Sequence, residues 1–485
     1  MRKLFLKSNI VTILIFINSI IGYSQPSTWY RVYGYPDITG EGRRVLQTFD
    51  GGFVALGYRE TGETGKSGIS ETFLIKYDFL GNFLWVKLIG DSTGRMPSDF
   101  RQTKDSGFVI TGHSFGAFLA KTDKNGNLQW EKNYQNLNPN TGSNCVAQTL
   151  DGGYIICGSY TDLVNPSEKG IVIKTDSLGI VQWEKQYMDS LFNYYGSIIQ
   201  ENNGYYYVYG GTQKIHPVVY WSVIKKLDSN GNIIWTKIFG VNIGGGNDII
   251  RLNSGNLIVG SYRTDYYFPV LSKLDTSGNI IWYKEYPGYS RFYYTSKDFN
   301  NNIILTGGND YLSSTITMMK FDTSGNFLKQ RNLLYSGYNL IGGHCANYTS
   351  DSGYIITGVA AITTPYLDYG YLLIIKADSA FNAPPVVGIN NISIQIPEKF
   401  QLLQNYPNPF NSSTRIRFSL PNNGNVNISI YNILGKKVFS IEKKYYMGLN
   451  EESIDFNNLS LCSGVYFFRI IFENKSKIIK AVYLK

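Results

Sequence analysis

Cysteine and histidine are scarce in this chain, which has 485 residues but only four cysteines and three histidines. So few cysteines exclude a small scaffold held together by many disulfides. His113, His216 and His344 lie far apart, and none forms the H-x-x-x-H spacing of a zinc site. We therefore expect no metal and no cofactor, and we expect the histidines to have packing roles.

Charged residues are also few, at 17% of the chain, whereas 43% of the residues are hydrophobic, so the chain can bury a sizeable core. The net charge of +9 is concentrated at the two ends, because residues 1–24 carry +3 and residues 398–485 carry +6. The main part is balanced, which argues against a nucleic-acid-binding protein. G-x-S-x-G, H-E-x-x-H and phosphate-loop motifs are missing, so we assign no catalytic residue.

Long apolar runs are missing except near the N-terminus. Arg2, Lys3 and Lys7 precede an apolar run over residues 10–21. This run is shorter than the roughly 20 residues of a membrane-spanning helix. Small residues at 22 and 24 suit cleavage before Gln25. We predict a signal peptide at residues 1–24 and no transmembrane segment after its removal.

The chain is rich in repetition. A K-x-D triplet occurs seven times, at steps of 45 to 56 residues. A tryptophan follows the aspartate by seven residues in the first five units, whereas the sixth unit has Lys329 there and the seventh has Pro385. The triplets are Lys76–Asp78, Lys121–Asp123, Lys174–Asp176, Lys226–Asp228, Lys273–Asp275, Lys320–Asp322 and Lys376–Asp378.

Two turn signals separate the apolar runs of each repeat. One is D-x-G before an aromatic residue, as in "DGGFVALG" at residues 50–57, with looser copies such as "NSGNLIVG" at residues 253–260. The other is a D-x-x-G-N turn that starts at the triplet's aspartate. Glycine accepts the positive φ that such hairpin turns need. Two hairpin turns per repeat give four short strands, and seven repeats predict an all-β fold, a seven-bladed β-propeller over residues 25–385.

The opening stretch "WYRVYG", Trp29–Gly34, has the form of a fourth strand that lacks the three strands before it. The seventh repeat lacks its fourth strand, because Pro384 and Pro385 follow its third. We therefore predict that residues 29–34 pair with the strand around Ile374 and close the ring through backbone hydrogen bonds.

Residues 386–397 read as a linker, and residues 398–485 as a small Ig-like β-sandwich with strands such as "VNISIYNI" and "GVYFFRIIF". The tail contains "QNYPNPFN", "IYNILGKKV", "LSLCSGVYFFRI" and a terminal "KIIKAVYLK". In these segments it resembles the C-terminal sorting domain of type IX secretion cargo, found in Bacteroidetes and related bacteria. The residues that carry the resemblance are Asn405, Tyr406, Pro407, Asn408, Pro409, Phe410, Gly435, Gly464, Tyr466 and Lys485.

This resemblance implies export through the periplasm and an outer-membrane translocon, which is therefore an expected partner. Release or attachment at the cell surface would follow. The repeats resemble those of bacterial seven-bladed β-propeller proteins. They also resemble, in architecture only, the blades of quinone-dependent dehydrogenases, whose vicinal cysteine pair is missing here.

Several residues have both a functional and a structural interpretation. Cys145 and Cys157 lie six residues to either side of Asp151, so a regular hairpin would place them opposite each other, within disulfide range. Position 157 also suits a small core residue. "DKNGN" at residues 123–127 copies half of a calcium loop, but Tyr134 stands where the loop needs glutamate, which favours a plain turn.

The repeated tryptophans could form a sugar-stacking ring, but packing between blades is favoured because it buries large apolar area. His113 and His344 lie in different blades and could meet only near the ring axis. Tyrosine-rich stretches at residues 205–211 and 265–270 fit sugar or protein contacts as well as strand packing.

We expect an exported, non-catalytic binding or adhesion module for a glycan or an envelope protein, because loops from seven blades converge around one funnel. The alternative is a secreted polysaccharide hydrolase or lyase with converging carboxylates in that funnel, and the sequence identifies no such pair.

Overall fold

The structure is a computed structural model, which describes most of the chain. The predicted signal peptide and linker, as well as His216, Tyr406 and Lys485, lie outside the described residues. The described residues are 28–33, 40–61, 69–90, 94–114, 116–134, 141–162, 167–188, 192–214, 218–289, 292–308, 315–334, 340–363, 368–384, 400–405, 407–421, 424–445, 448–459 and 461–484.

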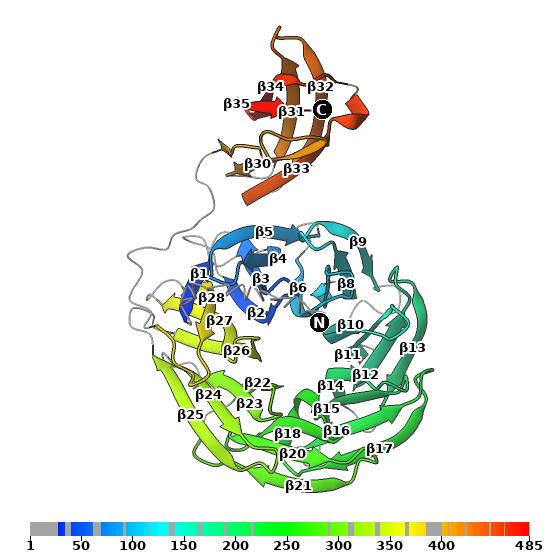
Figure 1. Cartoon of the computed structure of the whole chain (residues 1–485). Coiled ribbons are helices and arrows are strands. Elements are labelled where there is room, and N and C mark those ends of the chain that lie inside the picture. The colour runs from blue at the N-terminus through cyan, green and yellow to red at the C-terminus, as the bar shows by residue number, and fades with distance from the viewer. Residues whose placement is uncertain are drawn as a thin grey trace, which may run out of the picture.

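Seven antiparallel four-stranded sheets stand around a central opening, which confirms the predicted seven-bladed propeller (Figure 1). In blades one to six the strands follow chain order from the ring axis outward, and one parallel bridge between Glu168 and Phe192 joins blades three and four. Blade one consists of β2 (Gly40–Gln47), β3 (Phe53–Thr61), β4 (Ile69–Tyr77) and β5 (Phe83–Ile89). Blade two consists of β6 (Met96–Gln102), β7 (Phe108–Ser114), β8 (Gly116–Thr122) and β9 (Leu128–Asn133). Blade three consists of β10 (Thr141–Gln148), β11 (Tyr154–Asp162), β12 (Ser167–Thr175) and β13 (Val181–Tyr187). Blade four consists of β14 (Phe192–Gln200), β15 (Tyr206–Lys214), β16 (Val219–Leu227) and β17 (Ile233–Phe239). Blade five consists of β18 (Ile243–Arg251), β19 (Leu257–Arg263), β20 (Pro269–Leu274) and β21 (Ile280–Glu285). Blade six consists of β22 (Phe292–Lys297), β23 (Ile303–Gly308), β24 (Thr315–Phe321) and β25 (Phe327–Leu334).

Blade seven combines both ends of the propeller. It consists of β26 (Leu340–Tyr348), β27 (Tyr354–Thr363), β28 (Asp368–Ala377) and the first strand of the chain, β1 (Trp29–Tyr33). β1 pairs antiparallel with β28 and places Arg31 opposite Ile374, so the predicted pairing is confirmed. Trp29 stands opposite Lys376, in the register that Trp85 has opposite Lys76 in blade one. The N-terminal strand thus supplies the tryptophan that the seventh repeat lacks.

Each of these tryptophans packs on the glycine of the next blade's D-x-x-G turn. A Cβ atom on Gly81 would lie 2.6 Å from the Trp29 ring, and one on Gly126 would lie 2.8 Å from the Trp85 ring. Gly81 has a φ of +79° and Gly126 has a φ of +77°. Residues with a side chain rarely adopt this conformation. The tryptophans therefore act as wedges between blades, in agreement with the packing interpretation.

The interface between blades six and seven departs from this arrangement. Lys329 replaces the tryptophan of blade six, and Phe381 replaces the turn glycine of blade seven, with φ of 63°. Lys329 Nζ lies 4.3 Å from the Phe381 ring centroid and donates to the carbonyl of Ser379 at 3.1 Å. The equivalent carbonyl in blade four, Ser229, accepts a hydrogen bond from Trp183 Nε1. The aromatic ring has thus moved to the other side of the interface.

In blades one, two, three and seven the lysine of the K-x-D triplet is buried against the upstream turn of its own blade. Lys121, Lys174 and Lys376 lie 2.8 Å from the carboxylates of the D-x-G aspartates, and Lys76 pairs with Asp50. A buried ammonium group is costly without such a partner. The triplet and the D-x-G turn are therefore two halves of one ion pair.

Blades four to six satisfy the same lysine in other ways. Glu201 lies 3.1 Å from Lys226, and Asp298 lies 2.7 Å from Lys320, with each acid two residues upstream of the usual aspartate position. In blade five Lys273 donates instead to the carbonyl of Thr323 in blade six, at 3.0 Å. These differences explain why the upstream turns of these repeats match the pattern only loosely.

The tail forms a small β-sandwich, as predicted. One sheet contains β29 (Gln401–Leu402), β30 (Ser413–Leu420) and β33 (Gly448–Asp455), and the other contains β31 (Gly424–Asn432), β32 (Lys437–Tyr445), β34 (Gly464–Phe472) and β35 (Lys475–Tyr483). A short 3-10 helix, η1 (Asn457–Leu459), follows β33. Aromatic residues such as Phe410, Phe456 and Tyr483 fill the space between the sheets.

Candidate functional site

The innermost strand of every blade contains a β-bulge near its start. The pairing register with the second strand jumps by two residues in six blades and by four in blade five. A bulge leaves the extra residue unpaired and re-aims its side chain. The extra residues are Arg43, Ser98, Asn144, Gly196, the segment 245–247, Tyr293 and His344. Because the innermost strands surround the central opening (Figure 1), these residues form a ring at the axis, which we call the funnel rim.

The funnel rim is unequal around the ring. Blades six, seven and one contribute the large polar side chains of Tyr293, His344 and Arg43, whereas blade four contributes Gly196 and blade five a segment that begins Gly245-Gly246. The spacing that locates these residues is present in the sequence: in every blade one rim residue lies seven positions before the aspartate of the D-x-G turn or the residue that takes its place. This signal concerns the pairing register of the innermost strand, which the turn and strand patterns alone do not reveal.

The polar side of the rim is a connected cluster. Arg43 Nη2 lies 2.8 Å from Glu41 Oε1, and the Arg43 guanidinium lies 5.2 Å from the ring centroid of Tyr58. The Nδ1 of His344 is 2.9 Å from the carbonyl of Gly42, and because a carbonyl only accepts, Nδ1 carries the hydrogen. Nε2 of His344 is therefore the acceptor nitrogen of the neutral ring, 4.0 Å from Glu41 Oε2.

Both histidines of the described residues neighbour Arg43, as expected if they meet near the axis. Burial and then the Arg43 charge lower the pKa of His113. Burial also lowers the pKa of His344, although the Glu41 carboxylate acts in the opposite direction. Both rings are therefore neutral at pH 7, and the Arg43 charge is balanced by Glu41. The rim presents hydrogen-bonding groups without a net charge.

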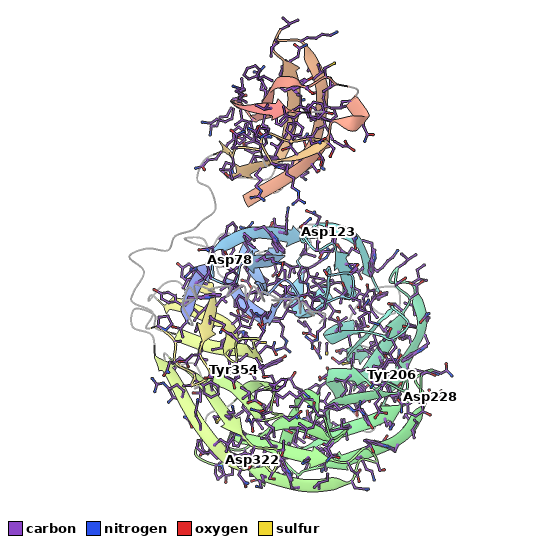
Figure 2. The ribbon with its side chains drawn as sticks, in the orientation of Figure 1. Asp78, Asp123, Tyr206, Asp228, Asp322 and Tyr354 are labelled. Atoms are coloured by element: carbon purple, nitrogen blue, oxygen red, sulfur yellow. The ribbon has the colours of Figure 1, made fainter. Side chains whose placement is uncertain are left out.

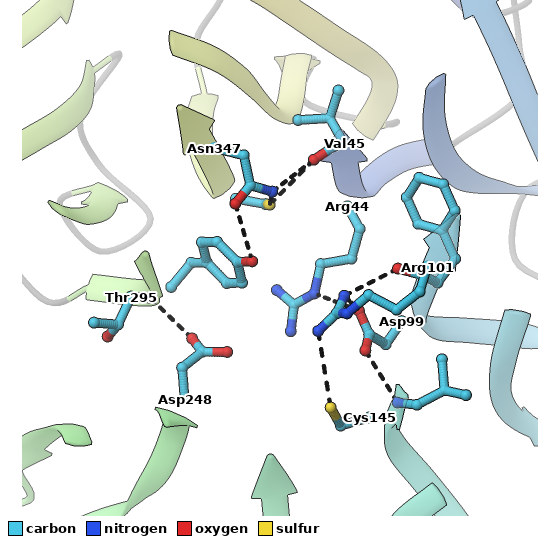
Figure 3. Close-up of polar contacts among 12 residues, drawn as sticks. Arg44, Val45, Asp99, Arg101, Cys145, Asp248, Thr295 and Asn347 are labelled. Atoms are coloured by element: carbon cyan, nitrogen blue, oxygen red, sulfur yellow. Dashed lines mark hydrogen bonds and ion pairs between the residues drawn. The ribbon is translucent and has the colours of Figure 1, made fainter. Parts of the chain in front are cut away.

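Beneath the rim, two guanidinium groups and two carboxylates occupy the axis, and we call this layer the funnel floor (Figure 3). Asp99 Oδ1 accepts from Arg101 Nη1 at 2.5 Å and from Arg44 Nε at 3.3 Å, and its Oδ2 accepts from the Val146 amide at 3.1 Å. The Arg44 guanidinium lies 4.6 Å from the ring centroid of Tyr294. One aspartate thus connects the innermost strands of blades one, two and three.

The second carboxylate of the floor is in a less favourable position. Asp248 is buried and accepts from the Thr295 amide at 2.9 Å. Burial raises its pKa to about 6, because the charge of Arg44 offsets only part of the loss of hydration. Asp99 and Asp248 are both almost fully buried and engaged, so they do not form the open pair of carboxylates that glycoside hydrolysis requires.

The aspartates of the D-x-x-G-N turns have no role in a shared site. Asp123 Oδ1 accepts from the amides of Asn125 and Asn127, both at 2.8 Å, which confirms the turn interpretation. Figure 2 shows Asp78, Asp123, Asp228 and Asp322 spread around the ring. Within the described residues, no group of three or more His, Cys, Asp or Glu side chains could hold a metal ion.

Cys145 stands directly opposite Cys157 in the register of β10 and β11, as the hairpin spacing predicted. Both are buried free thiols in the structure. Burial first, and then the hydrogen bond with Cys145, raise the pKa of Cys157 well above its ordinary value, so the Cys157 thiol does not resemble a nucleophile. The disulfide between them stays a prediction for the exported protein.

In the tail, the residues that suggested a sorting signal hold its two ends together. The Phe410 amide donates to the carbonyl of Val482 at 3.0 Å, and the Leu484 amide donates to the carbonyl of Phe410 at 2.8 Å. Asn408 Oδ1 accepts from the Val482 amide at 2.8 Å. Asn405 Nδ2 donates to the carbonyl of Pro407 at 3.2 Å. Residues 407–410 thus fasten the last strand.

Two glycines and a tyrosine of the same set have local roles. Gly435 takes a φ of +76° in the turn that Asn432 caps. Gly464 begins β34 opposite Tyr483. Tyr466 is buried and donates its hydroxyl to the carbonyl of Cys462 at 2.8 Å. Together with the fastened C-terminal strand, they make residues 404–484 one structural unit.

Comparison with protein families identifies this unit. Residues 404–484 match the family model of the secretion system C-terminal sorting domain. The tail is such a domain, which implies secretion or cell-surface export by the type IX system. None of the described residues forms a helix long and apolar enough to cross a bilayer.

No curated protein matches the chain. Among solved structures, the chain is similar to a streptogramin B lyase, with 12% identity, a TM-score of 0.44, and coverage of 72% of this chain and 97% of the lyase. It is also similar to Sqt1 of Chaetomium thermophilum, with 11% identity, a TM-score of 0.45, and coverage of 72% and 97%. Likenesses at this level do not bear on what the present protein binds.

Proposed function

We propose that this chain, exported by means of its sorting domain, is a binding protein whose ligand enters the axial funnel. The observation that carries the proposal is the repeated bulge, which gives the axis at least one rim residue from every blade. Large polar side chains on blades six, seven and one face small or glycine residues on blades four and five, and this asymmetry favours a ligand that sits to one side of the axis.

The electrostatics of the rim favour a neutral, polar ligand. Arg43 is paired with Glu41, and burial keeps His344 neutral, so the rim offers hydrogen bonds without net charge. Sugar hydroxyls and peptide amides have this character, which supports a glycan or a segment of an envelope protein as the ligand.

The test is a screen of the mature chain on glycan and peptide arrays, followed by calorimetry with each ligand found. Arg43→Ala should weaken binding about tenfold or more, because a charge-assisted hydrogen bond contributes about 1.5–3 kcal/mol. Arg331→Ala removes an exposed arginine on the outer strand of blade six and is the matched control. If Arg43→Ala binds as tightly as the control, the ligand does not use the funnel.

A second candidate is a hydrolase or lyase, and one observation favours it. His344 is neutral, its Nδ1–H is held by the carbonyl of Gly42, and its Nε2 is the acceptor nitrogen, which is the condition of a general base. A parallel screen for reducing ends and for unsaturated products would identify such activity. His344→Asn should abolish turnover while leaving ligand binding nearly intact, whereas equal loss of both would indicate a binding role alone.

A further inference from the structure

Blade five carries an exposed aromatic loop that the funnel does not use. Residues 264–268 connect β19 to β20 and contain three consecutive aromatic residues, Tyr266, Tyr267 and Phe268. Tyr266 is 72% exposed and Tyr267 is 46% exposed, which is unusual for side chains of this size. We call these three residues the aromatic platform.

The rings of the platform are arranged in order. Tyr266 and Phe268 lie nearly parallel, with an interplanar angle of 9° and centroids 6.1 Å apart. Tyr267 lies nearly parallel to Tyr262 of β19, at 16° and 6.2 Å. Parallel exposed rings present flat apolar faces to solvent, and these faces match the apolar C–H face of a pyranose ring.

The backbone of the loop is held in an unusual conformation. Tyr267 has a φ of 57°, which is rare for an aromatic residue and strains the backbone. Its amide donates to the carbonyl of Arg263 at 2.8 Å, and the Thr264 amide donates to the carbonyl of Asn242 at 2.9 Å. A strained conformation persists only where its surroundings fix it, so the rings are pre-positioned before a ligand arrives.

The charges beside the platform decide what kind of ligand fits. Arg263 donates to both oxygens of Asp265, at 2.9 and 2.5 Å, and to Glu285 Oε1 at 3.3 Å. The arginine is thus occupied by two carboxylates, and the cluster has an excess negative charge. Anionic polymers are repelled there, whereas sugar hydroxyls can donate to the carboxylate oxygens.

We propose that the aromatic platform is a binding site for the pyranose rings of a neutral polysaccharide. The platform lies at the start of β18, since Ile243 pairs with Arg263, and so at the bulge end of blade five. It is formed by residues that take no part in the rim cluster. The proposal therefore stands or falls independently of the funnel.

The test is affinity gel electrophoresis of the mature chain in gels that contain xylan, galactomannan, hydroxyethyl cellulose or glycogen, with polygalacturonate as the anionic comparison. We expect at least one neutral polymer to retard the protein and polygalacturonate to have no effect. Tyr266→Ala should weaken this retardation about tenfold, and Tyr266→Phe should largely keep it, because the ring face is what binds.

The matched control is Phe299→Ala, which removes a ring that is 80% exposed at the opposite end of blade six. This variant should be retarded like the wild type. Arg43→Ala separates the two proposals, since loss of retardation in that variant alone would assign the polymer to the funnel. The platform proposal is overturned if no neutral polymer retards the protein, or if Tyr266→Ala migrates like Phe299→Ala.

Discussion

Two arcs of the same ring are built with different regularity. In the regular arc, which is blades seven, one, two and three, every blade has its tryptophan, its D-x-G aspartate and its buried lysine pair. In the irregular arc, blades four, five and six, the acid moves or is missing, and Lys329 takes the place of a tryptophan. The blades of both arcs nevertheless pack against their neighbours. The packing contacts between blades are therefore kept even where the residues that make them differ.

The largest effect should come from opening the ring within the regular arc. Deleting residues 29–33 removes β1 and leaves β28 without its outer partner, so we expect loss of cooperative unfolding in urea. Trp29→Ala alone should lower the free energy of unfolding by about 3–5 kcal/mol, as expected for a buried aromatic. Leu128→Ala, on an outer strand, is the control. A near-normal deletion variant would show that ring closure adds little stability.

The next effect concerns the exchanged aromatic at the irregular interface. Phe381→Gly should cost about 3–4 kcal/mol, and Lys329→Trp should cost about 1–3 kcal/mol because two rings then compete for one space. The double variant recreates the tryptophan–glycine wedge of the other interfaces. We expect it to recover about 2–3 kcal/mol relative to the sum, measured as a double-mutant cycle in urea unfolding. If the stability effects of the two substitutions were strictly additive, Lys329 and Phe381 would not be an exchanged form of the tryptophan–glycine contact.

A smaller effect should distinguish how the two arcs satisfy the buried lysine. Asp151→Ala leaves Lys174 without its carboxylate and should cost about 1–3 kcal/mol at pH 7. Glu201→Ala should cost a similar amount in blade four, whereas Ser254→Ala, at the Asp151 position of blade five, should cost nearly nothing. Equal unfolding midpoints for all three variants would mean that the carboxylates do not stabilise the lysines.

The loss of stability in Asp151→Ala should also depend on pH. Burial raises the pKa of Asp151, but hydrogen bonds from Lys174 and Thr149 outweigh it, so its pKa in the folded state is lower than in the unfolded state. Its contribution is therefore present above the unfolded pKa of about 3.9 and is lost as the pH falls through the folded value. The difference between wild type and Asp151→Ala should narrow in acid, measured by thermal unfolding at pH 7 and pH 3.

Replacing each of the two funnel-floor aspartates by asparagine should change the free energy of unfolding in opposite directions. Because burial raises the Asp248 pKa to about 6, its ionisation opposes folding, and stability falls as the pH rises from about 4 to 6. Asp248→Asn should therefore be neutral or stabilising by up to about 3 kcal/mol at pH 7. Asp99→Asn should destabilise, since Arg44 and Arg101 lose their shared anion. Destabilisation by both would contradict the assignment.

The smallest effect concerns the cysteines, which differ even within the regular arc. We predict a disulfide between Cys145 and Cys157 in the exported protein, whereas Cys345 faces Thr357 in blade seven and cannot form the equivalent bond. Alkylation followed by mass spectrometry should leave only Cys345 and Cys462 modified in the denatured, unreduced protein. Four alkylated thiols would show that the pair stays reduced.

The repeat pattern predicted the blades well because turn chemistry is local. Asp-x-Gly turns and alternating apolar strands act within about ten residues, and the position of "WYRVYG" then left only one place for the first strand. The lysine–aspartate pair could not be predicted from the repeat pattern, because Lys174 and Asp151 are 23 residues apart and meet only when β11 and β12 pair. In the sequence, Lys329 at a tryptophan position and Phe381 at a turn-glycine position are two separate departures from the repeat. Only the structure shows that they lie at the same interface.

The amino-acid sequence by itself determined the number of blades, the closing strand and the export signal, since each depends on a pattern that repeats or on a contiguous motif. Only the tertiary structure decided where the funnel rim and floor lie. Arg44, Asp99, Asp248 and Tyr294 come from four blades, and nothing local relates them. Their proximity arises because a closed ring brings the start of every innermost strand to one axis, so electrostatics there depend on closure and not on any single repeat.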